Sequence, residues 1–251
     1  MHPTRRPALA RQGSRYFGIS IALLTGALSI SYDEYFRKCY DNTNADQAIV
    51  ACTVVITKRL VEKDDLAAAL KNRGNAYDDK GEYDRALDDY DQAVSIKADD
   101  SDAFNSRGTT HSAMGHYDLA IRDFDQAIKL NPASTMAFNN RCFAKALAGQ
   151  MERALADCNE SLRIKPKNPG ALASRGFVHL KLKRYEAAIA DYDAEFRVNP
   201  GNPYSLYGRG IAKLIRGDLR GGDADIVAAQ AVRSDIADQM AKLGIQVGEA
   251  Q

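Results

Sequence analysis

The strongest constraint on this 251-residue chain is a pattern that recurs every 34 residues. Cut from Ala67 onward, the chain gives five units in register: 67–100, 101–134, 135–168, 169–202 and 203–236. Such self-similarity is typical of stacked supersecondary units, none of which can bury its apolar face alone. The sequence therefore predicts a solenoid rather than a globule with one central core.

Each unit shows the same internal order of side chains. Positions 4 and 24 are mostly bulky, positions 8 and 20 are mostly small, and a glycine recurs near position 15 in four units. Small residues let two helices approach closely, and a glycine in left-handed backbone ends a helix. The glycines near position 15 are Gly81, Gly115, Gly149 and Gly217. Each unit is therefore expected to be two helices joined by a tight turn.

The strings NRGNAYDDKGEYDRALDDYDQAV and SRGTTHSAMGHYDLAIRDFDQAIKLNP resemble the tetratricopeptide repeat family. The resemblance covers about two thirds of the chain. It implies an all-α fold, a right-handed superhelical solenoid of antiparallel helix pairs. It also implies a non-enzymatic protein that binds another protein or a peptide on its concave face.

The flanks of the repeats have predictable roles. Residues 30–66 align as a degenerate helix pair, with Ala48 at position 20 and Cys52 at position 24, and would form an N-terminal cap. The repeats occupy 67–234, although the last helix pair is expected to reach residue 236. Residues 235–251 are interpreted as a C-terminal capping helix and tail, because SDIADQMAKL (234–243) has helical spacing.

Residues 1–29 hold four arginines and no acidic residue, and an apolar run from Tyr16 to Ile30 overlaps their end. This pattern resembles a secretory signal peptide. The run is short for a spanning helix, which needs about 20 apolar residues. A cleaved signal is the preferred interpretation, with an uncleaved membrane anchor and an extension without a targeting role as alternatives. Membrane contact is expected only through this segment.

The four cysteines form two local pairs in the repeat register. Cys142 replaces the small residue at position 8 and Cys158 the bulky residue at position 24, so they should face each other. Cys39 and Cys52 take positions 11 and 24 of the degenerate unit. An even count behind a signal-like leader favours two disulfides, and four buried thiols in a reducing compartment are the alternative. Exported bacterial tetratricopeptide proteins similar to this chain would place it in the periplasm.

Arginine at position 7 and aspartate at position 23 recur in all five units. A recurrence within one chain favours a shared structural role, a ladder of Arg–Asp contacts within or between units. A row of arginines that binds anions is the functional alternative. The residues are Arg73, Arg107, Arg141, Arg175 and Arg209, with Asp89, Asp123, Asp157, Asp191 and Asp225.

Signs of catalysis are weak. His111 and His179 occupy a packing position, and neither a glycine-rich phosphate loop nor a zinc-ligand spacing is present. A net charge of +1 with alternating acids and bases does not indicate a nucleic-acid partner. We therefore expect no enzyme activity, cofactor or metal.

The family resemblance assigns the concave wall to first-helix positions 2, 5, 9, 12 and 13. The wall should change from polar in the early units to apolar in the later ones. An apolar patch rimmed by polar groups is a candidate partner site; contact with the C-terminal helix is the alternative. The principal groove residues are Lys71, Asn75, Asn105, Asn139, Phe143, Phe177, Leu180, Tyr207, Ile211 and Leu214.

Some family members clamp the carboxylate at the end of heat-shock chaperones. Lys71 and Asn75 match that motif, but Ser106, Met136 and Asn140 do not. Chaperone-tail binding is therefore not predicted. The expected function is an extracytoplasmic interaction scaffold in the bacterial envelope, and the alternative is a membrane-tethered structural subunit of a larger complex.

Overall fold

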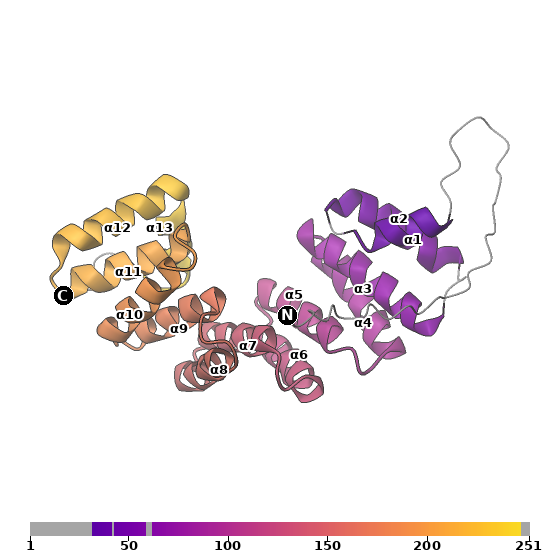
Figure 1. The fold of residues 1–251 in the computed structure, drawn as a ribbon, viewed down its shortest axis with the longest axis horizontal. Coiled ribbons are helices and arrows are strands. Elements are labelled where there is room, and N and C mark those ends of the chain that lie inside the picture. Colours follow the sequence, from indigo (N-terminus) through magenta and orange to yellow (C-terminus); the bar gives the residue numbers. More distant parts are fainter. Residues whose placement is uncertain (1–31, 42, 59–61, 247–251) are drawn as a thin grey trace, which may run out of the picture.

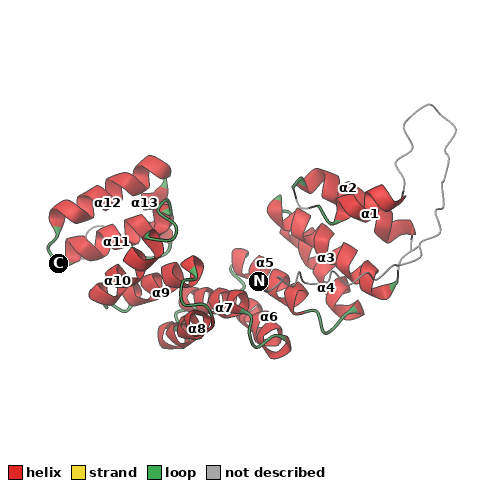
Figure 2. Ribbon diagram, in the orientation of Figure 1, coloured by secondary structure: helices red, strands yellow, loops and turns green. Residues whose placement is uncertain are grey.

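A computed structural model describes residues 32–41, 43–58 and 62–246 of the chain. The leader predicted for residues 1–29 lies outside this part. The described residues form thirteen helices and no strand (Figure 2). The helices are α1 Tyr32–Cys39, α2 Ala45–Lys58, α3 Lys63–Asp79, α4 Tyr83–Ile96, α5 Ser101–Ala113, α6 Tyr117–Leu130, α7 Thr135–Leu147, α8 Met151–Ile164, α9 Pro169–Lys181, α10 Tyr185–Phe196, α11 Pro203–Ile215, α12 Leu219–Val232 and α13 Ile236–Lys242.

Helices that follow each other in the chain pack side by side, and the pairs stack into a curved row (Figure 1). The first helices of successive units, α3, α5, α7, α9 and α11, also contact one another. The second helices α6, α8 and α10 lie on the outer side of the curve (Figure 1). The predicted all-α solenoid of antiparallel helix pairs is therefore confirmed.

Close helix approach within a unit depends on the small residue at position 8. A Cβ atom added to Gly108 would lie 2.8 Å from a ring carbon of Phe124, and Gly74 and Gly176 meet tyrosine rings at the same distance. The unit 135–168 fills this space differently, because the sulfur atoms of Cys142 and Cys158 lie 1.97 Å apart. This is disulfide distance, and the second pair, Cys39 and Cys52, is also at disulfide distance.

The turn between the two helices of a unit uses left-handed backbone, as expected. Gly81, Gly115, Gly149 and Gly217 have φ between 73° and 88°. The unit 169–202 lacks this glycine, and Lys183 adopts φ 58° instead. A side chain is strained in this region, so the turn of that unit is held by the packing on either side.

One helix start differs from the predicted unit boundary. Helix α3 begins at Lys63, four residues before the predicted unit, and Asp64 and Asp65 in its first turn favour this start through the helix dipole. Helix α13 is seven residues long and lies within the segment 235–251 that was expected to hold a capping helix. Among the described helices, none is both long and apolar enough to cross a bilayer.

Candidate partner-binding face

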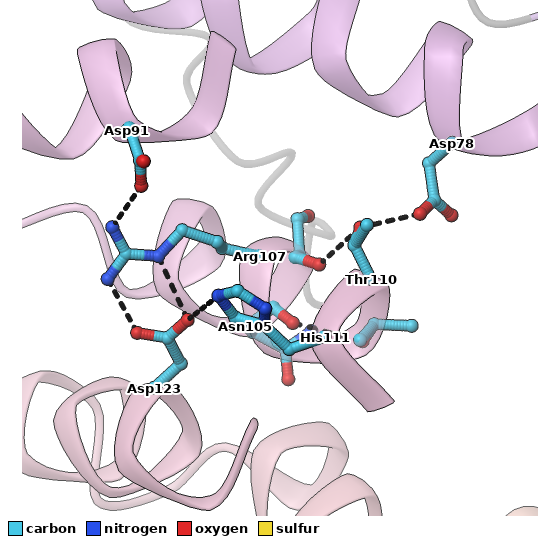
Figure 3. Close-up of polar contacts among 9 residues, drawn as sticks. Asp78, Asp91, Asn105, Arg107, Thr110, His111 and Asp123 are labelled. Atoms are coloured by element: carbon cyan, nitrogen blue, oxygen red, sulfur yellow. Dashed lines mark hydrogen bonds and ion pairs between the residues drawn. The ribbon is translucent and has the colours of Figure 1, made fainter. Parts of the chain in front are cut away.

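A ladder of arginine and aspartate side chains joins the units. In Figure 3, Arg107 of α5 lies between Asp91 of α4 and Asp123 of α6. Its Nε and Nη2 atoms donate to Asp123 at 2.9 and 2.6 Å, and its Nη1 atom donates to Asp91 at 2.7 Å. The arginine therefore bonds within its own unit and to the unit before it.

The same bidentate pair occurs in all five units, with Arg–Asp distances of 2.6–2.9 Å. The third contact goes to position 25 of the preceding unit, which is Asp125 for Arg141, Asn159 for Arg175 and Asp193 for Arg209. Arg73 instead donates to Thr53 of the degenerate pair at 3.0 Å. The structural interpretation of the recurring arginine and aspartate is confirmed. Because each ladder guanidinium is paired with a carboxylate of its own unit, an anion-binding row is not supported.

Position 11 adds a second basic group to the ladder. Lys145 and Lys213 lie 2.8 Å from the ladder aspartates of their own units. In two other units this position is histidine; the Nε2 atom of His179 is 3.7 Å from Asp191, and that of His111 is 4.0 Å from Asp123. Burial lowers the pKa of both histidines below 6.5, so both are neutral at pH 7. The histidines are packing residues, as expected.

The inner wall of the N-terminal units is polar, and its side chains bond both within a unit and across unit boundaries. The hydroxyl of buried Thr110 donates to Asp78 at 2.5 Å (Figure 3). The amide of Asn140 donates to the buried side chain of Asn105 at 3.1 Å. Asn75 accepts a hydrogen bond of 2.7 Å from the hydroxyl of Tyr90. These contacts hold the wall in place and leave exposed groups such as Thr109 beside them.

Lys71 is not a free cation on this wall. Its ammonium group lies 2.8 Å from Asp100, and the other oxygen of Asp100 accepts hydrogen bonds from the first turn of α5. The helix cap therefore neutralises the lysine that resembles part of the chaperone clamp.

The C-terminal wall is apolar, but helix α13 covers much of it. Phe177, Leu180, Tyr207 and Ile211 are each 6% exposed or less. They share one cluster with Ile236 and Met240 of α13 and with Ile245 beyond it. In Figure 1, α13 lies on the inner side of the C-terminal arm. These four groove candidates are therefore buried rather than presented to a partner, which agrees with the alternative of contact with the C-terminal helix.

Leu214 also lies away from the open groove. A Cβ atom added to Gly222 would lie 2.6 Å from Cγ of Leu214, so this leucine fills the space between α11 and α12. Other units have alanine at the position of Gly222. The glycine compensates for the larger leucine opposite it, so Leu214 belongs to the packing of its own unit.

Phe143 and Asn139 of α7 remain at the border between the polar and the apolar wall. Phe143 is partly buried, and its ring centre lies 5.7 Å from that of Phe177. Oδ1 of Asn139 is buried and accepts no hydrogen bond from any described residue. Of the groove candidates, the structure thus brings Phe143 and Phe177 into contact and separates them from the N-terminal polar set.

The C-terminal capping segment was predicted, but its individual contact residues were not named from the sequence. Ile236, Met240 and Leu243 follow an i, i+4, i+7 spacing, which marks one face of a short helix. Lys181 of α9 fixes this segment, since its ammonium group donates to the carbonyl oxygens of Leu243 and Gly244 at 3.1 and 3.2 Å. The spacing was visible, but it did not say which side of the solenoid the helix would cover.

No metal-binding site is found on this face among the described residues. The described residues hold no group of three or more histidine, cysteine, aspartate or glutamate side chains placed to bind a metal ion. The ladder carboxylates are paired with arginine, and the histidines beside them are neutral.

Comparison with known proteins agrees with the geometry. A family model for the tetratricopeptide repeat matches residues 67–100 and 101–134. No curated protein matches the chain. Among solved structures, PilF of Pseudomonas aeruginosa is 16% identical with a TM-score of 0.68, over 84% of this chain and 97% of that one.

Two further structures share the fold. A tetratricopeptide repeat protein from Parabacteroides merdae is 18% identical, with a TM-score of 0.66 over 84% of this chain and 83% of that one. YrrB, described as a tetratricopeptide repeat protein with an unusual peptide-binding site, is 19% identical, with a TM-score of 0.55 over 76% and 98% of the two chains.

The fold and the recurring ladder define a helical-repeat protein whose units are antiparallel helix pairs. The two matched units lie at the N-terminal end of the series, and the later units repeat their register. Two units of the chain match the tetratricopeptide repeat family, and the chain shares the fold of solved tetratricopeptide repeat proteins.

Proposed function

We propose that this protein is a non-catalytic scaffold that binds a protein or peptide on its concave face. The observation that carries the proposal is the continuous inner wall of first helices, polar along α3, α5 and α7 and apolar along α9 and α11. The ladder that joins the units is structural, which leaves the polar part of the inner wall available to a partner. The described peptide-binding site of YrrB, a protein of the same fold, supports this choice.

The polar half is suited to an extended segment of a partner. Thr109 is exposed, and Asn75 and Asn140 are partly exposed while their other contacts hold them in place. Hydroxyl and amide groups can donate to and accept from a peptide backbone. Fixed side chains also lose little freedom when a partner binds, which favours affinity.

Affinity capture with two matched variants tests this proposal. Met136→Arg changes an exposed side chain at a predicted wall position of α7, and Leu119→Arg changes an exposed side chain on the outer helix α6. Both variants replace an exposed apolar group with the same charged one. We expect Met136→Arg to lose partners that the wild type and Leu119→Arg retain. Equal capture by all three proteins would contradict binding on the concave face.

We further propose that the scaffold acts in the bacterial envelope. The basic and apolar composition of residues 1–30 and the two cysteine pairs at disulfide distance support an oxidising, extracytoplasmic location. Mass spectrometry of the protein from the envelope fraction, with thiol alkylation before reduction, tests this. Loss of the leader and four unlabelled cysteines are expected. An intact leader would favour the alternative, a membrane-tethered structural subunit, and labelled cysteines would contradict the oxidising location.

A further inference from the structure

Helix α10 ends earlier in its unit than the other second helices do, and its early end exposes two apolar side chains. The other second helices end at position 30, whereas α10 ends at Phe196, which is position 28. The carbonyl oxygen of Glu195 accepts from the backbone N–H groups of Val198 and Asn199 at 2.9 and 2.8 Å, and the chain turns away from the helix there. Phe196 is 37% exposed and Val198 is 48% exposed, although the residues at these two positions are at least partly buried in the three preceding units.

Two further exposed apolar side chains lie on the same edge of the solenoid. Because the helices of a pair are antiparallel, each second helix ends at the edge where the next first helix begins. Tyr204 in the first turn of α11 is 38% exposed, and Val232 at the end of α12 is 60% exposed. Arg233, which follows α12, donates to the hydroxyl of Tyr204 at 3.2 Å, and Asn202 before α11 donates to Glu195 of α10 at 3.3 Å. The edge therefore joins exposed apolar groups from the ends of α10, α11 and α12.

The turns on this edge carry basic side chains and no acidic ones. Residues 163–170, after α8, and residues 196–204, after α10, contain no aspartate or glutamate. Lys165, Lys167 and Arg197 are exposed, and among the described residues no acidic side chain lies within ion-pair distance of them. An apolar cluster of α8, α9 and α10 residues connects the two turns. Unpaired cations and exposed apolar groups thus alternate along one edge.

The same edge has the opposite charge in the N-terminal half. Residues 97–104, between α4 and α5, hold three aspartates and one lysine. Residues 32–134 as a whole hold 13 basic and 20 acidic residues, a net charge of −7, and residues 135–251 hold 17 basic and 13 acidic residues, a net charge of +4. A negatively charged surface is therefore attracted to the C-terminal half of the edge and repelled by the N-terminal half.

An anionic lipid surface matches this edge better than a second protein does. Cations that meet lipid phosphates and apolar side chains that enter the headgroup region are the two contributions to binding at a membrane surface. Tyr204 suits that interface, because its ring is apolar and its hydroxyl is polar. An acidic protein would need a hollow for each apolar side chain beside its carboxylates, whereas a bilayer accepts such side chains at any spacing.

We propose that the edge formed by residues 163–170, 196–204 and 232–233, the basic edge, binds the surface of an anionic phospholipid bilayer. Its unpaired cations contact the lipid phosphates, and its exposed apolar side chains enter the headgroup region. The inference goes beyond the proposed scaffold function, because none of the principal groove residues belongs to the basic edge. It also adds a membrane contact to the one expected through the N-terminal segment.

Co-sedimentation with lipid vesicles tests the basic edge on the full chain. The probes are vesicles of phosphatidylcholine mixed with phosphatidylglycerol and vesicles of phosphatidylcholine alone. We expect binding to the mixed vesicles that weakens as salt is raised, because salt screens exposed charges, and much weaker binding to phosphatidylcholine alone. Every variant keeps residues 1–31, so binding through that segment would leave all variants alike.

Two matched double variants locate the contribution of charge. Lys167→Glu with Arg197→Glu reverses two cations of the basic edge. Arg153→Glu with Arg220→Glu reverses two exposed cations at the starts of α8 and α12, on the opposite edge, and changes the net charge equally. Each basic residue near an anionic membrane surface strengthens binding about fivefold, so the first variant should bind mixed vesicles at least about 25-fold more weakly. The second variant should bind like the wild type.

A second matched comparison locates the apolar contribution. Val198→Ser with Val232→Ser changes two exposed valines of the basic edge, and Leu219→Ser with Val227→Ser changes two exposed apolar side chains of α12 outside it. Covering the exposed part of two valines strengthens binding about tenfold, so the first variant should bind about tenfold more weakly and the second should not. Thermal melts confirm that all four variants are folded.

The proposal is overturned if the wild type does not bind the mixed vesicles, if it binds both kinds of vesicle equally, or if either basic-edge variant binds as well as its matched control. Loss of captured proteins by the Lys167→Glu, Arg197→Glu variant without any vesicle binding would assign the edge to an acidic protein instead. These results leave the concave face untouched, since partner capture by Met136→Arg tests it. Conversely, equal capture by Met136→Arg and Leu119→Arg would contradict the scaffold function while vesicle binding persists.

Discussion

The two halves of the solenoid share one ladder but have different inner walls. Arg107 and Arg209 make the same bidentate bonds to Asp123 and Asp225, although the two arginines lie three units apart. Near Arg107 the inner wall is polar, with bonds such as that between Asn140 and Asn105. Near Arg209 it is apolar and covered by α13.

This difference separates stability from recognition. Because the ladder and the small residues at position 8 already fix how the helices stack, side chains on the inner wall are less constrained by the fold. The N-terminal half uses that freedom for polar groups that water can also reach. The C-terminal half uses it for apolar side chains, which need a cover, and α13 supplies the cover. The side chains of the inner wall therefore differ between the units, whereas the residues that stack the helices recur.

The largest expected change in the free energy of unfolding comes from comparing a methionine on the covered wall with one on the open wall. Met240 of α13 is 2% exposed, whereas Met136 at a predicted wall position of α7 is 52% exposed. Met240→Ala should lower the free energy of unfolding by about 2–5 kcal/mol, because it removes a buried side chain and leaves a cavity. Met136→Ala should change it by less than about 0.5 kcal/mol.

Urea denaturation followed by circular dichroism measures both values, and binding of a hydrophobic dye reports whether the apolar wall becomes accessible. Similar losses in the two variants would remove the contrast between a covered and an open wall. Loss of stability without increased dye binding in Met240→Ala would show that another segment takes over the cover.

The next effect concerns the border between the halves, where Cys142 and Cys158 join α7 to α8. The pair spans a sequence separation of 16 residues. Replacing both cysteines by alanine should lower the free energy of unfolding by about 3 kcal/mol, the value of the chain-entropy model for such a loop. Hydrogen exchange should show the loss first in α7 and α8. The matched variant without Cys39 and Cys52 should lose protection in α1 and α2 instead.

Much of the fold could be predicted because residues of the same type recur at the same packing positions in five units. The glycine at position 8 and the aromatic residue at position 24 meet in three units, and the arginine and aspartate of the ladder meet in all five. A contact that recurs in register can be recognised without coordinates. Even the degenerate pair follows the register, since Thr53 takes the place of the aspartate at position 25.

The inner wall could be predicted only in part. Family positions placed Phe177 and Ile211 on the wall, but their burial depends on α13, whose seven residues belong to no repeat. A helix this short is not stable alone, so its place is decided by the surface that accepts it. The bond between Asn105 and Asn140 joins non-equivalent positions of two units, and the repeat pattern does not show it.

The third prediction concerns pH and the C-terminal half. Glu195 of α10 is 1% exposed and stands where three other units have alanine. Its Oε1 atom accepts from Asn199 and Asn202, while Oε2 has no partner among the described residues. Burial raises the pKa of this carboxyl group above its ordinary value of 4.5. At a pH between the pKa values of the two states, the carboxyl group of Glu195 is therefore protonated in the folded chain and ionised in the unfolded chain.

This contribution to stability is complete below pH 4.5 and is lost as the pH rises toward the folded-state pKa. Glu195→Gln keeps the shape without the ionisation. The variant should gain stability relative to the wild type between acid and neutral pH, measured by urea denaturation at a series of pH values. In the N-terminal half, where alanine occupies this position, no such gain is available. A constant difference between the two proteins would contradict a proton held by Glu195.

The smallest effect tests whether the polar wall is a structural or a recognition surface. Asn140→Ala removes the hydrogen bond to Asn105, and the side chain of Asn140 is partly exposed, so water can replace part of the contact. The free energy of unfolding should fall by only about 0.5–1.5 kcal/mol. Partner capture should fall more than this loss of stability explains, because the chain remains folded. If stability falls by several kcal/mol instead, the polar half depends on its inner wall as much as the apolar half depends on α13, and the contrast between the two halves disappears.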